Sequence, residues 1–261
     1  MKELELDQIY NLDCLDGMKH IPDGSIDAII CDLPYGTTAC AWDTIIPFDQ
    51  LWEQYNRLIK PQGVIALFGS EPFSTMVRMS NFKHYKYDWY WVKSKANGFQ
   101  HAKNRPLMGV ETISIFSNAS MGHVSILGER RMTYNPQGVI ANGTNKITES
   151  VHGRTMGARP NQVGKVYEAF TNFPNNVLYF DNIFGIEAEH PTQKPVDLLR
   201  YLIRTYSNEG DTILDNCMGS GTTAVACIKE KRHFIGFELN KDYWNKACRR
   251  IDAERRQLSL F

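Results

Sequence analysis

The stretch Asp211–Thr223 reads DTILDNCMGSGTT and decides the fold of this chain. A short apolar run ends at Asp215, a loop with Gly219 and Gly221 follows, and a helical pattern begins at Thr222. The two glycines allow the backbone to turn tightly and to approach a ligand closely. A strand, a glycine loop and a helix in this order indicate a unit that holds a nucleotide-like ligand. Without a ligand, the same loop would be an ordinary glycine turn.

Three ligands compete for this loop. A phosphate-binding P-loop needs a lysine after its last glycine, and Thr222 stands there instead. A dinucleotide fingerprint prefers a third glycine where Ala224 stands, although looser forms accept alanine. S-adenosylmethionine fits at least as well, because Asp215 can face its positively charged methionine end. Glu238 closes the next strand and can accept hydrogen bonds from the diol of a ribose.

Outward from this stretch, strand-like and helix-like segments alternate. The expected strands are short apolar or β-branched runs at Ile26–Cys31, Gly63–Phe68, Tyr87–Val92, Glu111–Phe116 and His233–Glu238. The expected helices repeat apolar residues at spacings of three and four, at Phe48–Ile59, Pro195–Ser207, Thr222–Lys231 and the basic C-terminal segment. This alternation predicts an α/β fold with a doubly wound, mostly parallel, Rossmann-like sheet. Ligands of that architecture lie outside the carboxyl ends of the strands.

Length and composition place the chain among ordinary globular proteins. Its 261 residues suffice for one buried core with a substantial insertion, and 43% hydrophobic with 22% charged residues is a typical balance. The N-terminus lacks the apolar core of a signal peptide, and no run reaches about 18 apolar residues. We therefore expect a cytoplasmic protein without membrane contact. The six cysteines form no Cys-x-x-Cys pair, so we expect free thiols and no metal site.

The net charge of zero hides a strong asymmetry along the chain. Residues 1–90 hold 7 Lys and Arg against 13 Asp and Glu, and residues 166–261 hold 12 against 13. Residues 91–165 hold 10 against 3. A basic middle segment is typical of an insertion that binds a polyanion, although a solvated basic loop would have the same charge. Residues 133–176 are rich in Gly, Asn and Pro, and we expect an extended loop there.

The tetrapeptide Asp32-Leu33-Pro34-Tyr35 follows the expected strand at 26–31. The amino nitrogen of a nucleic-acid base is a poor nucleophile, because its lone pair is delocalised into the ring. A carboxylate from Asp32 and the carbonyl of Leu33 could accept its two hydrogens and localise that lone pair. Pro34 restricts the backbone of Leu33, and Tyr35 offers a flat face to an extruded base. By itself, the tetrapeptide is more typical of a turn that ends a strand.

A second polar turn, His190-Pro-Thr-Gln-Lys-Pro195, precedes the helix expected at 195–207. Lys194 could bind the carboxylate of a cofactor through a charge-assisted hydrogen bond. The alternative is a helix-start turn defined by its two prolines.

Together these motifs resemble the S-adenosylmethionine-dependent DNA amino-methyltransferases of the beta order. That family places the catalytic tetrapeptide first, a target-recognition region second and the cofactor loop last, as this chain does. The resemblance implies a class I methyltransferase fold, S-adenosylmethionine as cofactor, S-adenosylhomocysteine as product, and base flipping. It also implies a cofactor adenine contact at Asp13, within the segment Asn11–Cys14. The implied cofactor-binding residues are Asp13, Cys14, Lys194, Asp215, Gly219, Gly221, Thr222 and Glu238.

One position departs from the family pattern, which usually has proline where this chain has Leu33. The role implied for that position belongs to its backbone carbonyl, which leucine retains. Asp at the first position and Tyr at the fourth favour adenine N6 as the target, since cytosine-N4 enzymes more often begin with Ser. Cytosine-N4 methylation, methylation of RNA or of a protein glutamine, and a non-catalytic DNA-binding relative stay open as alternatives.

The resemblance divides the chain at 1–92 (catalytic half), 93–185 (basic target-recognition insertion) and 186–261 (cofactor-binding half). It implies double-stranded DNA as the substrate, with the DNA sequence unspecified. A homodimer and a cognate restriction nuclease stay open as partners. We expect DNA contacts from basic residues of the insertion, namely Lys93, Lys95, Lys103, Arg105, Arg130, Arg131, Arg154 and Arg159.

Overall fold

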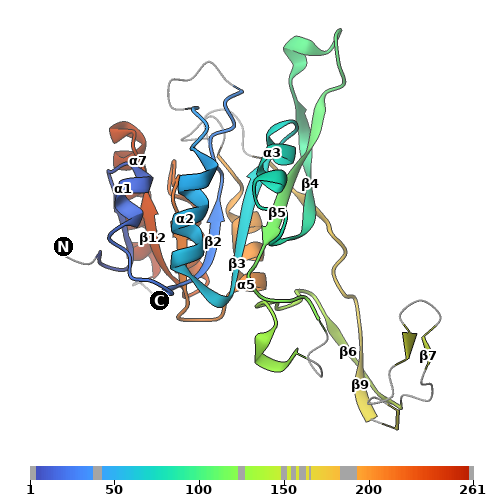
Figure 1. Ribbon diagram of the computed structural model, residues 1–261. Helices are drawn as coiled ribbons and strands as arrows, with labels where there is room; N and C mark the ends of the chain where they lie inside the picture. Colours follow the sequence, from blue (N-terminus) through green and yellow to red (C-terminus); the bar gives the residue numbers. More distant parts are fainter. Residues whose placement is uncertain are drawn as a thin grey trace. The chain divides into compact units, whose positions relative to one another are not determined.

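The computed structural model describes residues 4–37, 43–122, 127–147, 152–153, 157–158, 163–164, 166–182 and 193–258 (Figure 1). The chain forms two compact units, one of residues 1–135 with 176–261 and one of residues 136–175. This division differs from the predicted boundaries after residues 92 and 185. The predicted insertion covers residues 93–185, and its residues 93–135 belong to the larger unit. Two strands of this part extend the main sheet.

The larger unit is built on an eight-stranded sheet with the order β1-β12-β11-β2-β3-β5-β4-β10. All neighbouring strands pair in parallel except β5, which is antiparallel to both β3 and β4. The strands are β1 (Gln8–Tyr10), β2 (Ile26–Cys31), β3 (Ile59–Gly69), β4 (Tyr85–Asn97), β5 (Met108–Phe116), β10 (Val177–Phe180), β11 (Thr212–Asp215) and β12 (His233–Phe237). The predicted mostly parallel α/β fold is therefore confirmed.

Helices cover both faces of this sheet, as a doubly wound fold requires (Figure 1). Three of them contribute to one apolar core, namely α1 (Cys14–Met18), α2 (Phe48–Leu58) and α3 (Phe73–Ser80). Three further helices of the described residues contribute to a second core, namely α5 (Val196–Tyr206), α6 (Thr222–Lys229) and α7 (Lys241–Leu258). Successive residues of β2 alternate between the two cores, with Ile29 in the first and Ile30 in the second. A strand buried on both faces explains the uninterrupted apolar run seen in the sequence.

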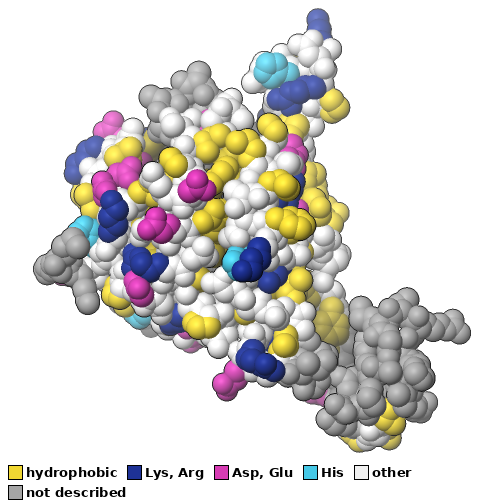
Figure 2. Space-filling model, in the orientation of Figure 1, with side chains coloured by type: hydrophobic (Ala, Val, Ile, Leu, Met, Phe, Trp, Pro, Cys, Tyr) yellow, Lys and Arg dark blue, Asp and Glu magenta, His cyan; other side chains and the backbone are white. Residues whose placement is uncertain are grey.

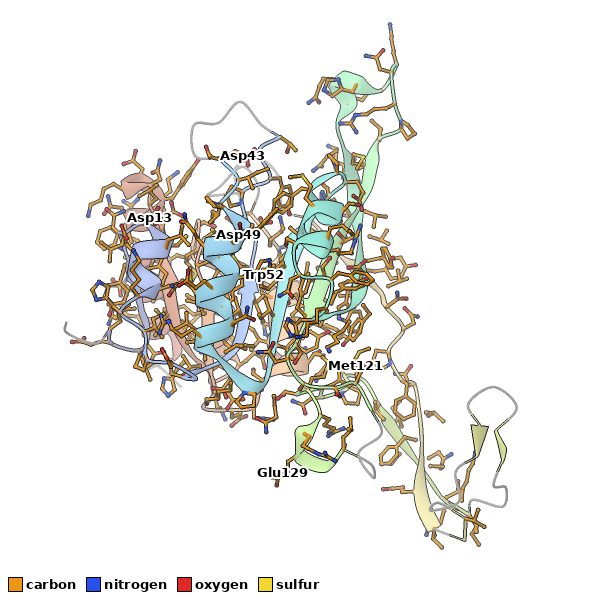
Figure 3. The ribbon with its side chains drawn as sticks, in the orientation of Figure 1. Asp13, Asp43, Asp49, Trp52, Met121 and Glu129 are labelled. Atoms are coloured by element: carbon orange, nitrogen blue, oxygen red, sulfur yellow. The ribbon has the colours of Figure 1, made fainter. Side chains whose placement is uncertain are left out.

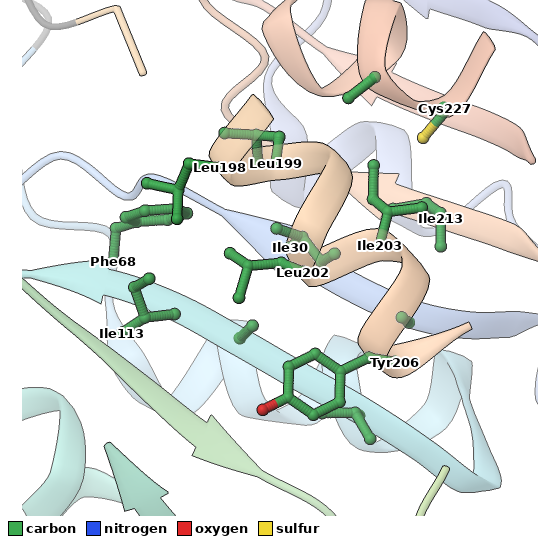
Figure 4. Packing of buried hydrophobic residues seen from close by; sticks show 14 of the residues in the cluster. Ile30, Phe68, Ile113, Leu198, Leu199, Leu202, Ile203, Tyr206, Ile213 and Cys227 are labelled. Atoms are coloured by element: carbon green, nitrogen blue, oxygen red, sulfur yellow. The ribbon is translucent and has the colours of Figure 1, made fainter. Parts of the chain in front are cut away.

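Helix α5 shows how the sequence pattern becomes packing. Its buried side chains, Leu198, Leu199, Leu202, Ile203 and Tyr206, face strand residues of the sheet (Figure 4). The sequence predicts Val196, Leu199, Leu202, Ile203 and Tyr206 on one face of this helix, and the last four are buried while Val196 is half-buried against the same core. Burying each such leucine contributes about 1.5–3 kcal/mol. This packing fixes the start of α5, and with it the preceding segment that carries Lys194.

Strands β4 and β5 form a hairpin that extends beyond the carboxyl end of the sheet (Figure 1). Between them lies a short 3₁₀ turn, Phe99–His101. Lys, Arg and His side chains gather at the tip of this hairpin (Figure 2). The hairpin therefore carries basic side chains away from the core on the edge where ligands of such sheets bind.

The smaller unit contains a β-hairpin. Strand β6 (Ile140–Ile147) pairs antiparallel with β9 (Val166–Thr171), and two-residue strands β7 (His152–Gly153) and β8 (Gly157–Ala158) pair with each other. The prediction of an extended loop over 133–176 was wrong for these strands. Their pairing joins segments far apart in the sequence, and β6 has no buried face to produce an alternating pattern.

Among the helices that the structure describes, none combines the length and the apolar character needed to cross a membrane.

Candidate active site

A cavity of about 460 Å³ lies at the carboxyl ends of β2, β11 and β12. Two groups of side chains contribute to its lining. The first, the glycine-loop side, comprises Asp13, Cys14, Asp215, Gly219, Thr222 and Glu238. The second contains the tetrapeptide predicted to be catalytic and is called the catalytic wall; it comprises Asp32, Leu33, Pro34, Tyr35, Lys93, Glu111 and Lys194. The structure thus brings the predicted catalytic and cofactor residues to one cavity, apart from Gly221, which does not line it.

The glycine-loop side is held together mainly by backbone amides. The amide of Gly219 donates to Glu238 Oε2 at 2.8 Å, and the amide of Asn240 donates to Glu238 Oε1 at 2.7 Å. Asp215 accepts from the amide of Cys217 at 3.0 Å and from the hydroxyl of Thr223 at 2.5 Å. These bonds fix both carboxylates at the mouth of the loop, and each oxygen keeps a lone pair for a ligand.

Burial governs the charge on this side. It raises the pKa of Asp215 to about 6, although the hydrogen bonds from Thr223 and Cys217 oppose that rise. Burial also raises the pKa of Glu238. A cationic ligand group beside these carboxylates would favour their ionised forms.

Gly221 lies at a close contact between two helices. It has φ +81°, in the left-handed region that favours glycine, and it caps the start of α6. A Cβ at this position would lie 3.1 Å from the Cβ of Ala247 in α7. The predicted role of Gly221 in the turn therefore has a physical reason, namely the close approach of two helices.

Asp13 stands at the start of α1. Its carboxylate accepts from the amides of Leu15 at 2.9 Å and Asp16 at 3.3 Å, which is the usual arrangement of a helix N-cap. Figure 3 shows Asp13 and Asp43 at the same end of the sheet. Capping positions the Asp13 carboxylate at the cavity, where it remains available as a hydrogen-bond acceptor.

The tetrapeptide predicted to be catalytic holds its carboxylate in a fixed orientation. The hydroxyl of Tyr35 donates to Asp32 Oδ1 at 2.7 Å, and Lys194 Nζ donates to Asp32 Oδ2 at 2.6 Å. The ring of Tyr35 stacks on Phe73 with a centroid separation of 4.8 Å, and Leu33 is buried. Burial raises the pKa of Asp32, and the Lys194 ammonium acts in the opposite direction. Asp32 thus has a fixed orientation and a nearby cation that favours its ionised form.

The structure places Lys194 in the catalytic wall, whereas the prediction assigned it to the cofactor carboxylate. Its ammonium lies 2.6 Å from Asp32 and 3.3 Å from Glu111. Burial lowers the pKa of Lys194, whereas the two carboxylates raise it. The carboxylates have the larger combined effect, so the pKa of Lys194 is raised. His190, Pro191 and Thr192 of the same motif lie outside the described residues.

Lys93 and Glu111 also differ from expectation. Lys93 was predicted to contact DNA, but its side chain is buried and forms an ion pair with Glu111. Glu111 was expected only as part of a strand. Trp91 lies opposite Glu111 in the register of β4 and β5, so Lys93 and Glu111 are diagonal neighbours on one face. Only the register of this hairpin could have paired them, and the sequence does not reveal that register.

Asp43 is a second residue that the sequence reasoning missed. Its carboxylate accepts from the amides of Gly36 at 2.8 Å and Thr37 at 2.9 Å. Asp43 thereby holds the loop after the catalytic tetrapeptide. Its contacts span only a few residues, but no pattern in the sequence distinguishes it from a solvated aspartate.

The other predicted DNA-contacting residues fall into two groups. The side chains of Lys95, Lys103, Arg105, Arg130 and Arg131 are exposed. The first three lie on the β4–β5 hairpin, and Arg130 and Arg131 lie at the turn that follows Gly128. Arg154 and Arg159 lie outside the described residues.

The parallel sheet, its glycine loop and the shared cavity define a class I methyltransferase. The chain belongs to the DNA methylase family of N6/N4 methyltransferases, which matches residues 26–249.

Individual relatives agree with this assignment. The chain is 28% identical to the type II methyltransferase M1.MboII of Moraxella bovis over 255 residues, which cover 94% of this chain and 96% of that protein. It is also 28% identical to the DNA adenine methyltransferase YhdJ of Escherichia coli K12, over 95% of this chain and 84% of that protein. The crystal structure of the M1.HpyAVI–SAM complex is similar in fold, with a TM-score of 0.59 and 23% identity over 94% of this chain and 98% of that one.

Proposed function

We propose that this DNA methylase transfers the methyl group of S-adenosylmethionine to N6 of an adenine that has been turned out of double-stranded DNA. The observation that carries the proposal is the position of Asp32. Its carboxylate is oriented by Tyr35 and Lys194 in the same cavity as the glycine loop. A reacting amino group beside Asp32 and a methyl donor at the loop would therefore be neighbours.

The glycine-loop side fits S-adenosylmethionine. Glu238 offers two oxygens to a ribose diol, and Asp13 offers a further acceptor for the adenine amino group. The carboxylate of Asp215 can compensate a positive charge on the methionine part. When bound, the cofactor supplies an activated methyl group on a sulfonium. Every other step of the reaction falls to residues of this chain.

The catalytic wall prepares the amino group for attack. The Asp32 carboxylate and the Leu33 carbonyl accept hydrogen bonds from its two N–H groups, which directs the nitrogen lone pair toward the methyl donor. Asp32 retains acceptor capacity for this purpose, because a carboxylate has about four lone-pair sites and two are engaged by Tyr35 and Lys194. The aromatic ring of Tyr35 lines the cavity and provides a surface on which the extruded base stacks.

Adenine is favoured over cytosine by two observations. The tetrapeptide begins with Asp and ends with Tyr, and one full-length relative is a DNA adenine methyltransferase. The family includes N4 as well as N6 enzymes, so cytosine N4 is the second candidate. The similarity to a type II methyltransferase supports a role in restriction and modification, with a nuclease of the same specificity as partner.

Methyl transfer from labelled S-adenosylmethionine to mixed genomic DNA tests the proposal. Nucleoside analysis of the product separates N6-methyladenine from N4-methylcytosine, and sequencing of the modified positions gives the recognition sequence. We expect N6-methyladenine from the native chain and about a thousandfold less from Asp32→Asn. N4-methylcytosine would contradict the adenine assignment. DNA binding without transfer to any DNA would support a non-catalytic relative instead.

A further inference from the structure

Glu111 is a buried acidic residue that the proposed reaction does not use. It lies on β5 between two ammonium groups: Glu111 Oε1 forms an ion pair with Lys93, and Glu111 Oε2 lies 3.3 Å from Lys194 Nζ. Among the described residues, Glu111 Oε2 is the buried side-chain atom that has no hydrogen bond. A buried carboxylate oxygen without a hydrogen bond requires an explanation, and the charge of the neighbouring Lys194 ammonium supplies one.

The four charged groups of the catalytic wall alternate in sign. From β4 inward they are Lys93, Glu111, Lys194 and Asp32, and the last three are linked through the single ammonium of Lys194. Two cations and two anions leave this buried cluster neutral. A buried cluster with a net charge would be strongly destabilised, because one of its charges would have no partner. The neutrality of the cluster therefore depends on Glu111 as much as on Asp32.

Asp32 is the member that would meet the substrate. Burial raises its pKa, Lys194 lowers it and Glu111 raises it, so the two neighbours act in opposite directions. For Glu111, burial also acts to raise the pKa, but Lys194 and Lys93 together lower it, so Glu111 is ionised. The charged and titratable groups that face Asp32 are Cys31, Tyr35, Glu111, Lys194 and Asp215, and Lys93 joins them through its ion pair with Glu111.

We propose that Glu111 is a positioning residue for methyl transfer: it shares the Lys194 ammonium with Asp32, so that Lys194 stays oriented toward Asp32 while its positive charge is balanced beside the reacting amino group. The proposal rests on the catalytic role proposed above for Asp32. An ammonium has three donors, and a second acceptor prevents Lys194 from neutralising Asp32 alone. Positive charge develops on the amino nitrogen as it attacks the methyl group, and a neutral cluster opposes that charge less than a cationic one.

The test uses Glu111→Gln and Lys93→Met in the full chain. Glu111→Gln leaves the cluster with one excess positive charge, so kcat falls about tenfold or more while KM for DNA changes little. The acid limb of the kcat profile moves to lower pH, because the carboxylate that raised the pKa of Asp32 is gone. Lys93→Met leaves one excess negative charge and moves the same limb to higher pH.

The double variant Lys93→Met/Glu111→Gln restores neutrality, and its acid limb returns toward the wild-type position. Glu129→Gln is the matched control, since it removes an exposed carboxylate at the opposite end of the sheet (Figure 3). Thermal melting and S-adenosylmethionine binding establish that each variant is folded. A role in folding alone would lower kcat without shifting the two limbs in opposite directions, and that result would overturn the proposal. Absence of methyl transfer by the wild-type chain would instead reject the proposed function.

Discussion

The glycine-loop side and the catalytic wall share one cavity but are built by different physical means. The glycine-loop side is assembled by backbone amides that donate to Asp215 and Glu238, within a strand, a loop and a helix that are nearly contiguous in the sequence. The catalytic wall is assembled by side-chain charges from residues 32, 93, 111 and 194, carried by four separate segments. Backbone contacts tolerate many substitutions, whereas a buried cluster of charges changes with each member. We therefore expect the wall to respond to charge and the loop to respond to shape.

Asp32→Asn should produce the largest effect. It keeps the size of the side chain but removes the charge that holds the amino group, so single-turnover methyl transfer should fall by about a thousandfold. S-adenosylmethionine affinity, measured by calorimetry, should change less than about twofold, because Asp32 is separate from the backbone-built loop. A large loss of cofactor affinity would show that the two sides of the cavity are not independent.

Lys194→Met should come next, with a loss of about tenfold or more at neutral pH. Lys194 opposes the effect of burial on Asp32, so its removal raises the pKa of Asp32 further. The carboxylate form is then reached only at higher pH, and activity should recover as the pH of the assay increases. The pH profile of kcat measures this directly. Lys231→Met, which removes an exposed lysine, is the control and should leave the profile unchanged. Equal losses at every pH would argue against an electrostatic role.

Gly221→Ala should affect the loop through shape. An alanine with φ +81° is strained, and its Cβ would press against Ala247, so we expect the free energy of unfolding to fall by about 1–3 kcal/mol. The displaced loop should also weaken cofactor binding, whereas kcat at saturating cofactor should change less than in Lys194→Met. Thermal melting and calorimetry give both quantities. A shifted pH profile in this variant would contradict the distinction between charge and shape.

The same distinction explains how much the sequence could predict. Asp215, Gly219 and Glu238 could be proposed as site residues because a strand, a glycine loop and a helix are local patterns, and the fold followed from their alternation with other elements. Asp32 and Tyr35 could be proposed because a tetrapeptide is local as well. The contact of Lys194 with Asp32 was missed because it joins two segments that are 162 residues apart in the sequence. The burial of Lys93 was missed because its ion pair with Glu111 depends on the register of β4 and β5. Local periodicity carries no information on which residue lies opposite which in a hairpin.

Substitutions at the tip of the β4–β5 hairpin should have the smallest effect on activity. They test whether this hairpin contacts DNA. Its root contributes Lys93 to the wall, while Lys103 and Arg105 are exposed near its tip. Contacts with phosphates add affinity without entering the reaction, so Lys103→Ala/Arg105→Ala should raise KM for DNA about threefold to tenfold and leave kcat unchanged. Each lost phosphate contact should also reduce the slope of log affinity against log salt by about 0.9. Arg130→Ala/Arg131→Ala provides a comparison at a second exposed site of the same unit. If the hairpin variant keeps the wild-type salt slope, the tip does not contact DNA. The hairpin would then contribute to the reaction only through Lys93 at its base.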